Sequence, residues 1–121
     1  MSVINCNAST IRPLRLKEWL LDPQHVYIAH RKCIFIDGEQ YPKTDSIWAN
    51  PFKIGRDGTR EEVVCAYESL IRDRIQADPL LLSQLLSLKG KVLGCWCAPE
   101  LCHGDALLRL IEEFCNEEHK R

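Results

Sequence analysis

The residues best suited to chemistry are concentrated in one short stretch, residues 94–105. Thiols, an imidazole and a carboxylate occur together there: Cys95, Cys97, Cys102, His103 and Asp105. Thiolates act as nucleophiles and metal ligands, imidazole exchanges protons near neutral pH, and a carboxylate can serve as an acid or a base. This density of reactive groups predicts a functional site, for which three interpretations are open.

The first interpretation is a zinc site. Three thiolates and one imidazole, from Cys95, Cys97, Cys102 and His103, would complete a tetrahedral zinc shell. The C-x-C-x4-C-H spacing differs from the paired C-x2-C knuckles that are common in such sites. Two adjacent ligands, Cys102 and His103, also reach a single ion with difficulty.

The second interpretation is a pocket for an anion or nucleotide, with an activated thiol. A helix predicted to begin near Gly104 presents free N–H groups and a partial positive charge. We therefore expect a lowered pKa at Cys102, lowered further by His103, with Asp105 as an acid/base or a ribose ligand. Trp48 and Trp96 could supply stacking faces.

The third interpretation is purely structural. Cys95 and Cys97 would then fill the core as small apolar side chains. His103 and Asp105 would only cap the start of the following helix.

The elements that must position these groups follow from hydrophobic periodicity and from turn and cap signals. We predict strands at 3–6, 26–29, 33–36 and 91–96, a strand returning through 40–41 after an Asp37-Gly38 turn, and helices at 14–21, 60–77, 79–88 and 104–118. The strand at 91–96 is apolar on both faces, which is typical of a central parallel strand covered by helices. The sequence thus predicts one domain over 1–121, a small three-layer α/β fold with a mainly parallel central sheet, flanking helices and one antiparallel hairpin.

A second stretch, residues 47–55, has a Trp and a Phe on either side of an Asn50-Pro51 turn. Trp48 and Phe52 could form a minor core under a loop. They could equally frame a ligand pocket in which the Asn50 amide orients the ligand.

Composition limits the classes of function. The 121 residues carry a net charge of −1, with 45% hydrophobic and 27% charged residues, as in ordinary globular proteins. This balance argues against a nucleic-acid partner, although a local cluster of Arg12, Arg15 and Lys17 keeps a nucleic-acid-binding module as an alternative. We expect no membrane segment. Seven cysteines without a secretory signal pattern predict reduced thiols and an intracellular, cytoplasmic location.

The sequence resembles an uncharacterised family of small domains of unknown function from bacteria, phages, fungi and large DNA viruses. The resemblance covers roughly 19–110 and rests on four motifs: V-Y-I at 26–28, S-I-W-A-N-P-F at 46–52, G-T-R-E-E at 58–62, and L-G-C-W-C-A-P with C-H-G-D between 93 and 105. After Tyr27-Ile28 the family usually has Gly-Arg, whereas this chain has Ala29-His30-Arg31. We expect either that Arg31 substitutes in a shifted register or that the activity is altered.

This resemblance implies a single site that includes Trp48, Asn50, Pro51, Phe52, Arg60, Cys97, Cys102, His103 and Asp105. The last segment is also similar to a second uncharacterised family, in which a strand ending in cysteine leads to Cys-His-Arg at a helix start. That similarity favours an anion pocket over zinc. We therefore expect a pocket that binds or processes a small phosphorylated ligand such as a nucleotide, with Cys102, His103 and Asp105 as catalytic candidates. The candidate ligand-binding residues are Trp48, Asn50, Arg60, Trp96 and Cys97. A structural zinc module and a nucleic-acid module remain the alternatives.

Overall fold

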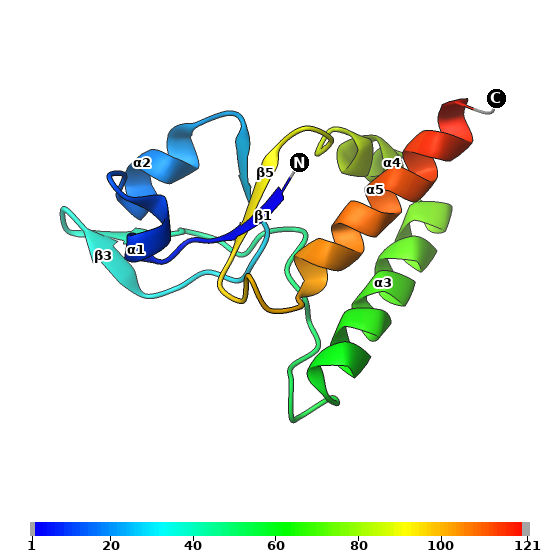
Figure 1. Ribbon diagram of the computed structural model, residues 1–121, viewed down its shortest axis with the longest axis horizontal. Coiled ribbons are helices and arrows are strands. Elements are labelled where there is room, and N and C mark those ends of the chain that lie inside the picture. Colours follow the sequence, from blue (N-terminus) through cyan, green and yellow to red (C-terminus); the bar gives the residue numbers. More distant parts are fainter. Residues whose placement is uncertain (1, 120–121) are drawn as a thin grey trace.

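The computed structural model describes residues 2–119, in which helices and strands are mixed along the chain (Figure 1). In chain order the elements are β1 (Ser2–Asn5), α1 (Ala8–Ile11), α2 (Leu16–Leu21), β2 (His25–Tyr27), β3 (Ile34–Ile36), β4 (Glu39–Tyr41), α3 (Arg60–Ala77), α4 (Pro79–Leu86), β5 (Val92–Cys95) and α5 (His103–His119). Residues 42–59 connect the hairpin to α3 without a helix or strand.

The central sheet has three parallel strands in the order β1-β5-β2, so β5 is paired on both sides. Its register places Leu93 beside Val3 on one side and beside Val26 on the other. Strands β3 and β4 form a separate antiparallel hairpin. Its turn has positive φ at Asp37 and Gly38, 54° and 81°, as tight hairpin turns require. The predicted α/β class, with a parallel sheet and one antiparallel hairpin, is confirmed.

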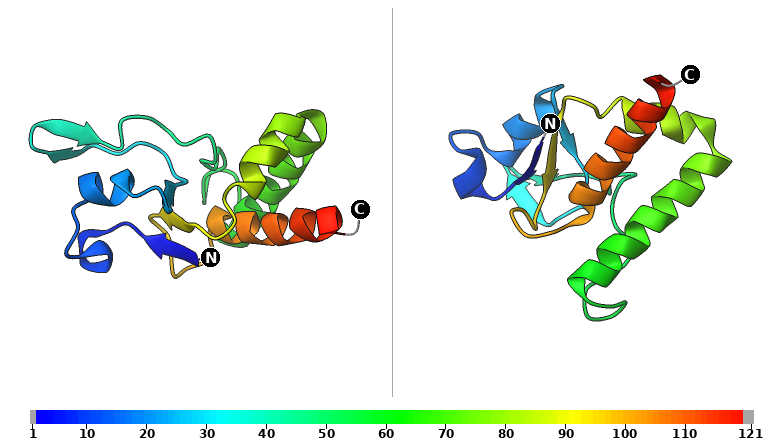
Figure 2. Two further views of the ribbon diagram at one scale, coloured as in Figure 1. Left: turned by 90° about the horizontal axis from the view of Figure 1, so that it is seen from above. Right: turned by 45° about the vertical axis from the view of Figure 1, so that its right-hand side comes forward.

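Side chains alternate across β5 and build a separate core on each face of the sheet. Leu93 and Cys95 pack into the larger core, which α3, α4 and α5 complete. Val92 packs on the opposite face against a smaller core that contains Cys6 and Trp19. Figures 1 and 2 show the two groups of helices on either side of the sheet, with α1 and α2 on one side and α3, α4 and α5 on the other.

Two glycines allow close packing around the sheet. A Cβ placed on Gly94 would lie 2.3 Å from Trp19 Cη2, so only glycine lets α2 approach β5 this closely. A Cβ on Gly104 would lie 2.8 Å from Val3 Cγ1. These contacts fix where β5 ends and where α5 begins, which are the two ends of the reactive stretch.

The local signals at helix ends act largely as predicted. The T-x-x-E pattern at Thr59 and Glu62 forms a capping box at the start of α3, and Asp78 caps α4 through its side chain. One element was not expected. No helix was predicted between the strand at 3–6 and the helix at 14–21, but the Asn7 side chain accepts a hydrogen bond from the Thr10 N–H and so starts the short helix α1.

No helix within residues 2–119 is both long enough and apolar enough to span a membrane.

Candidate functional site

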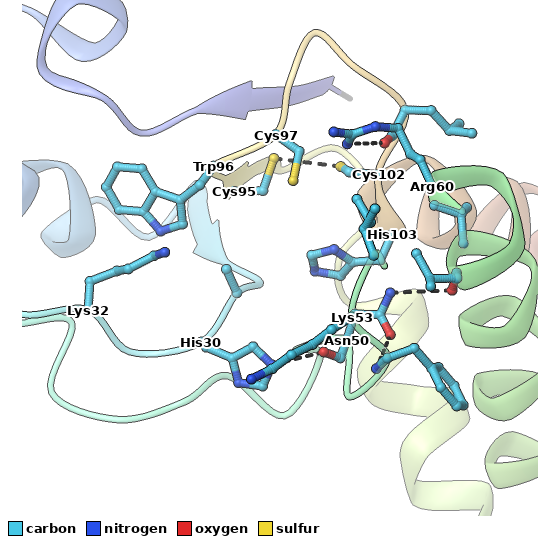
Figure 3. Close-up of a pocket in the computed structure, with 16 residues that line it drawn as sticks. His30, Lys32, Asn50, Lys53, Arg60, Cys95, Trp96, Cys97, Cys102 and His103 are labelled. Atoms are coloured by element: carbon cyan, nitrogen blue, oxygen red, sulfur yellow. Dashed lines mark hydrogen bonds between the residues drawn. The ribbon is translucent and has the colours of Figure 1, made fainter. Parts of the chain in front are cut away.

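The reactive stretch and the Asn-Pro loop meet at one cavity of about 270 Å³, beyond the carboxyl end of β5 (Figure 3). Parallel sheets commonly place their ligand sites at this end. Four segments line the cavity: the end of β5 and the loop to α5, the Asn50 loop, the first turn of α3, and the loop after β2. Their lining residues are Cys95, Trp96, Cys97, Leu101, Cys102, His103, Asn50, Phe52, Lys53, Ile54, Arg60, Val63, Val64, Ala29, His30 and Lys32.

Two thiols form a pair in this wall. Cys95 is the last residue of β5, and Cys102 lies directly before α5. Their sulfur atoms are 3.6 Å apart, and both side chains are almost fully buried. The Gly104 N–H donates to Cys102 Sγ at 3.3 Å, so the helix start contacts the pair.

The two thiols of this pair differ in acidity. The hydrogen bond with Cys102 lowers the Cys95 pKa to about 6, against the effect of burial, with further help from the Ala98 and Cys97 N–H groups. The same pairing and burial raise the pKa of Cys102. The expectation of a lowered Cys102 pKa is therefore wrong, because a helix-end effect cannot outweigh a neighbouring thiolate in a buried site. Cys95 is the thiolate candidate.

His103 is a neutral, buried imidazole. Its Nε2 lies 2.6 Å from the Ile28 carbonyl, to which it must donate, so Nδ1 is the nitrogen with the free lone pair. The ring packs edge-on against Tyr67, and burial lowers the His103 pKa. A neutral ring supplies no positive charge to a thiolate, and the described contacts include no hydrogen bond from His103 to Cys102. The expected activation of Cys102 by His103 is thus absent.

Asp105 lies outside the cavity wall. Its Oδ2 accepts the Cys102 N–H at 2.9 Å, which satisfies a backbone donor before α5. The sequence left two roles open for Asp105, a helix cap and an acid/base, and this contact is that of a helix cap.

The Asn50 loop is held by its own hydrogen bonds. The Asn50 side chain accepts the Phe52 N–H at 2.9 Å and donates to the Val63 carbonyl at 3.4 Å. Both ends of the amide are therefore engaged, although the residue lines the cavity. His30, which also lines the cavity, donates from Nε2 to the Asn50 carbonyl at 2.8 Å.

The two tryptophans have different environments. Trp48 is 3% exposed, belongs to the larger core and accepts the Tyr67 hydroxyl at its carbonyl, so it offers no stacking face to the cavity. Trp96 lines the cavity and is half-buried. Its Nε1 donates to the Tyr27 hydroxyl at 2.7 Å, and Lys32 Nζ lies 5.7 Å from the ring centroid.

Arg60 fastens the reactive loop to α3. Its Nη1 donates to the Leu101 carbonyl at 3.0 Å, and Nη2 lies 2.7 Å from a Glu100 carboxylate oxygen. Two of the guanidinium nitrogens are therefore already engaged, so Arg60, a predicted ligand-binding residue, mainly holds the loop before α5 in place.

Sequence reasoning missed the other cationic groups of the wall, Lys32 and Lys53. Lys53 follows the W-A-N-P-F motif directly, which was the available signal. Lys32 follows the unusual Ala29-His30-Arg31 segment. Lys32 lines the cavity there and Arg31 does not; the Arg31 N–H donates to Asp45.

The residues of the two alternative functions are arranged differently. Among residues 2–119, no three His, Cys, Asp or Glu side chains are grouped as metal ligands, so the predicted set of Cys95, Cys97, Cys102 and His103 is not assembled. In the basic cluster, Arg15 pairs with Glu18 and Asp37, and Lys17 also contacts Asp37. These carboxylates offset the charge that a nucleic acid would need.

Comparison with known proteins places the chain in a family. It is 28% identical over 74 residues to an uncharacterized 12.4 kDa protein from the nrdA-td intergenic region of Enterobacteria phage T4, covering 60% of this chain and 67% of the phage protein. No solved structure matches the chain. Residues 11–113 match the family described as Domain of unknown function (DUF4326), and the chain belongs to that family.

Proposed function

We propose that the cavity binds a small phosphorylated ligand such as a nucleotide. The observation that carries the proposal is the charge of the wall. Lys32, Lys53 and Arg60 line the cavity, and no Asp or Glu is among its described lining residues. Glu100 offsets Arg60, which leaves the two lysines as the groups available to an anion.

The walls also suit an aromatic base. Trp96 provides a half-buried indole face, and Phe52 lines the cavity from the Asn50 loop. Base stacking on an aromatic side chain contributes about 1–3 kcal/mol in single-stranded nucleic-acid complexes. A phosphate near the lysines and a base at Trp96 would use both features of the wall.

The cavity volume limits the size of the ligand. At about 270 Å³ it lies near the lower end of ligand pockets, which are roughly 300–1,000 Å³. A mononucleotide therefore fits better than a dinucleotide or an oligonucleotide. The neutral His103 Nδ1 and the Cys95 thiolate would be the reactive groups nearest to such a ligand.

The test is calorimetric titration with nucleoside monophosphates, the matching nucleosides and inorganic phosphate. The phosphorylated nucleosides should bind more tightly than the other two classes. Lys53→Ala and Lys32→Ala should each weaken binding about tenfold, the equivalent of about 1.4 kcal/mol. Lys43→Ala is the matched control, because Lys43 follows β4 outside the cavity and pairs with Glu39.

Two results would contradict the proposal. One is equal binding of nucleosides and their monophosphates, and the other is unchanged affinity in both cavity variants. Binding of an anion should also weaken as salt is added, because the lysines lie near solvent.

A further inference from the structure

The proposed ligand binding does not require the close contact between the sulfur atoms of Cys95 and Cys102. The sulfur atoms are 3.6 Å apart, whereas a disulfide needs about 2.0 Å. Closing the gap takes about 1.6 Å of combined movement, which rotation of the two side chains about their Cα–Cβ bonds can supply. The segment between them, 96–101, is neither helix nor strand and can follow that movement.

The pair is also distinguished from the other cysteines. Within residues 2–119 it is the only case of two cysteine sulfurs in hydrogen-bond contact. Both residues line the cavity, although each side chain is almost fully buried, so a small disulfide would have to approach the pair from the cavity side. The contact with Cys102 lowers the pKa of Cys95 to about 6, and the Gly104 N–H donates to Cys102 Sγ, so the two sulfurs are held side by side.

We propose that Cys95 and Cys102 form a redox-active dithiol that exchanges with low-molecular-weight disulfides entering the cavity. This activity goes beyond the proposed ligand binding and shares only its location. A thiolate attacks disulfides and a thiol does not, so Cys95 is the attacking group and Cys102 the resolving group. Lys32 and Lys53 favour a disulfide that carries carboxylates, as glutathione disulfide does, although only part of that molecule would enter a cavity of about 270 Å³.

The exchange takes two steps. Cys95 Sγ attacks one sulfur of the disulfide R–S–S–R, the S–S bond breaks, and one RS⁻ leaves while Cys95–S–S–R forms. Cys102 then loses its proton to solvent or to the departing thiolate, attacks Cys95 Sγ and releases the second RS⁻. Counted from Cys95 as the thiolate, the pair has lost two electrons and the Cys102 proton, and the small disulfide has become two RS⁻, one of which that proton can neutralise. Excess RSH reverses both steps.

The test uses the full chain and glutathione disulfide, with acid quenching and mass spectrometry. The expected product is lighter by about 2 Da, the mass of the two hydrogens lost in forming the bond, and excess reduced glutathione should restore the original mass. Digestion with a Glu-specific protease cleaves after Glu100, between Cys97 and Cys102. The disulfide should keep the two flanking peptides linked until reduction.

Variants assign the bond and supply the controls. The linked product should survive in Cys97→Ser and in Cys33→Ser and Cys65→Ser, where the latter two change exposed cysteines. It should disappear in Cys95→Ser and Cys102→Ser.

A link to Cys97, or glutathione adducts on exposed cysteines without the internal bond, would overturn the inference. Cys95 and Cys97 lie in the same peptide, so fragment-ion sequencing of the linked wild-type peptides decides this even if a serine variant fails to fold. The readout needs no nucleotide, so failure of phosphate binding and failure of exchange are separate outcomes.

Discussion

The indole ring of Trp19 packs directly against the backbone of Gly94, with no room for a side chain between them. A Cβ on Gly94 would lie 2.3 Å from Trp19 Cη2 and 2.6 Å from Cys6 Sγ. The next residue is Cys95, the last of β5. The packing of α2 on one face of the sheet therefore sets the position of the thiol on the other face.

Gly94→Ala should destabilise the protein by about 1–3 kcal/mol, because the added methyl group overpacks a buried contact. Urea unfolding followed by tryptophan fluorescence or circular dichroism measures the change. In Trp19→Leu the indole is absent, so the double variant should lose less stability than the sum of the single changes. Additive losses would show that the ring contact is not the source of the effect.

Alkylation with iodoacetamide should identify Cys95 as the thiolate. Its rate should be maximal above pH 7 and should fall as the pH drops through about 6, because the Cys95 thiolate takes up its proton there. Cys102→Ala removes the donating thiol and should move this inflection to higher pH, whereas Cys97→Ala keeps the donor. Peptide mapping by mass spectrometry follows each site, and an inflection near pH 8–9 in the wild type would contradict the assignment.

Burial of neutral His103 should make stability depend on pH. The His103 pKa is lowered in the folded protein. Below the ordinary histidine pKa of about 6.5, the unfolded chain therefore binds a proton at this residue and the folded chain does not. The free energy of unfolding is therefore unaffected by this residue above about pH 6.5. It decreases as the pH falls toward the pKa of His103 in the folded protein, by at most about 1.4 kcal/mol per pH unit.

His103→Gln retains an N–H donor for the Ile28 carbonyl but does not titrate. Its free energy of unfolding, measured with urea between pH 5 and 7.5, should therefore change less with pH than that of the wild type. His30→Gln is the control, because His30 is exposed. An equal slope in wild type and His103→Gln would rule out His103 as the source.

Asp105→Ala should cost about 1 kcal/mol of stability, because the Cys102 N–H loses its acceptor. Asp105→Asn keeps an oxygen acceptor and should recover most of this loss. Thermal or urea unfolding compares the two variants. Equal losses would indicate that the carboxylate charge, rather than the hydrogen bond, stabilises the start of α5.

Much of the fold follows from short-range patterns in the sequence. The run at 91–96, apolar on both faces, identified the central strand, and the Thr59–Glu62 capping box located the start of α3. These features depend on residues within a few positions of one another, so the sequence alone contains them. The short helix α1 was missed because one Asn7 side chain, rather than a periodic apolar face, starts it.

The sequence by itself therefore determined the elements, the faces of β5 and the location of the reactive groups at its carboxyl end. Only the tertiary structure decided which groups share the cavity. It buried Trp48, engaged both ends of the Asn50 amide, brought Lys32 and Lys53 to the wall and lowered the pKa of Cys95 rather than that of Cys102. The reason is physical: burial, hydrogen bonding and a thiol pair 3.6 Å apart depend on contacts between distant segments, which local spacing does not encode.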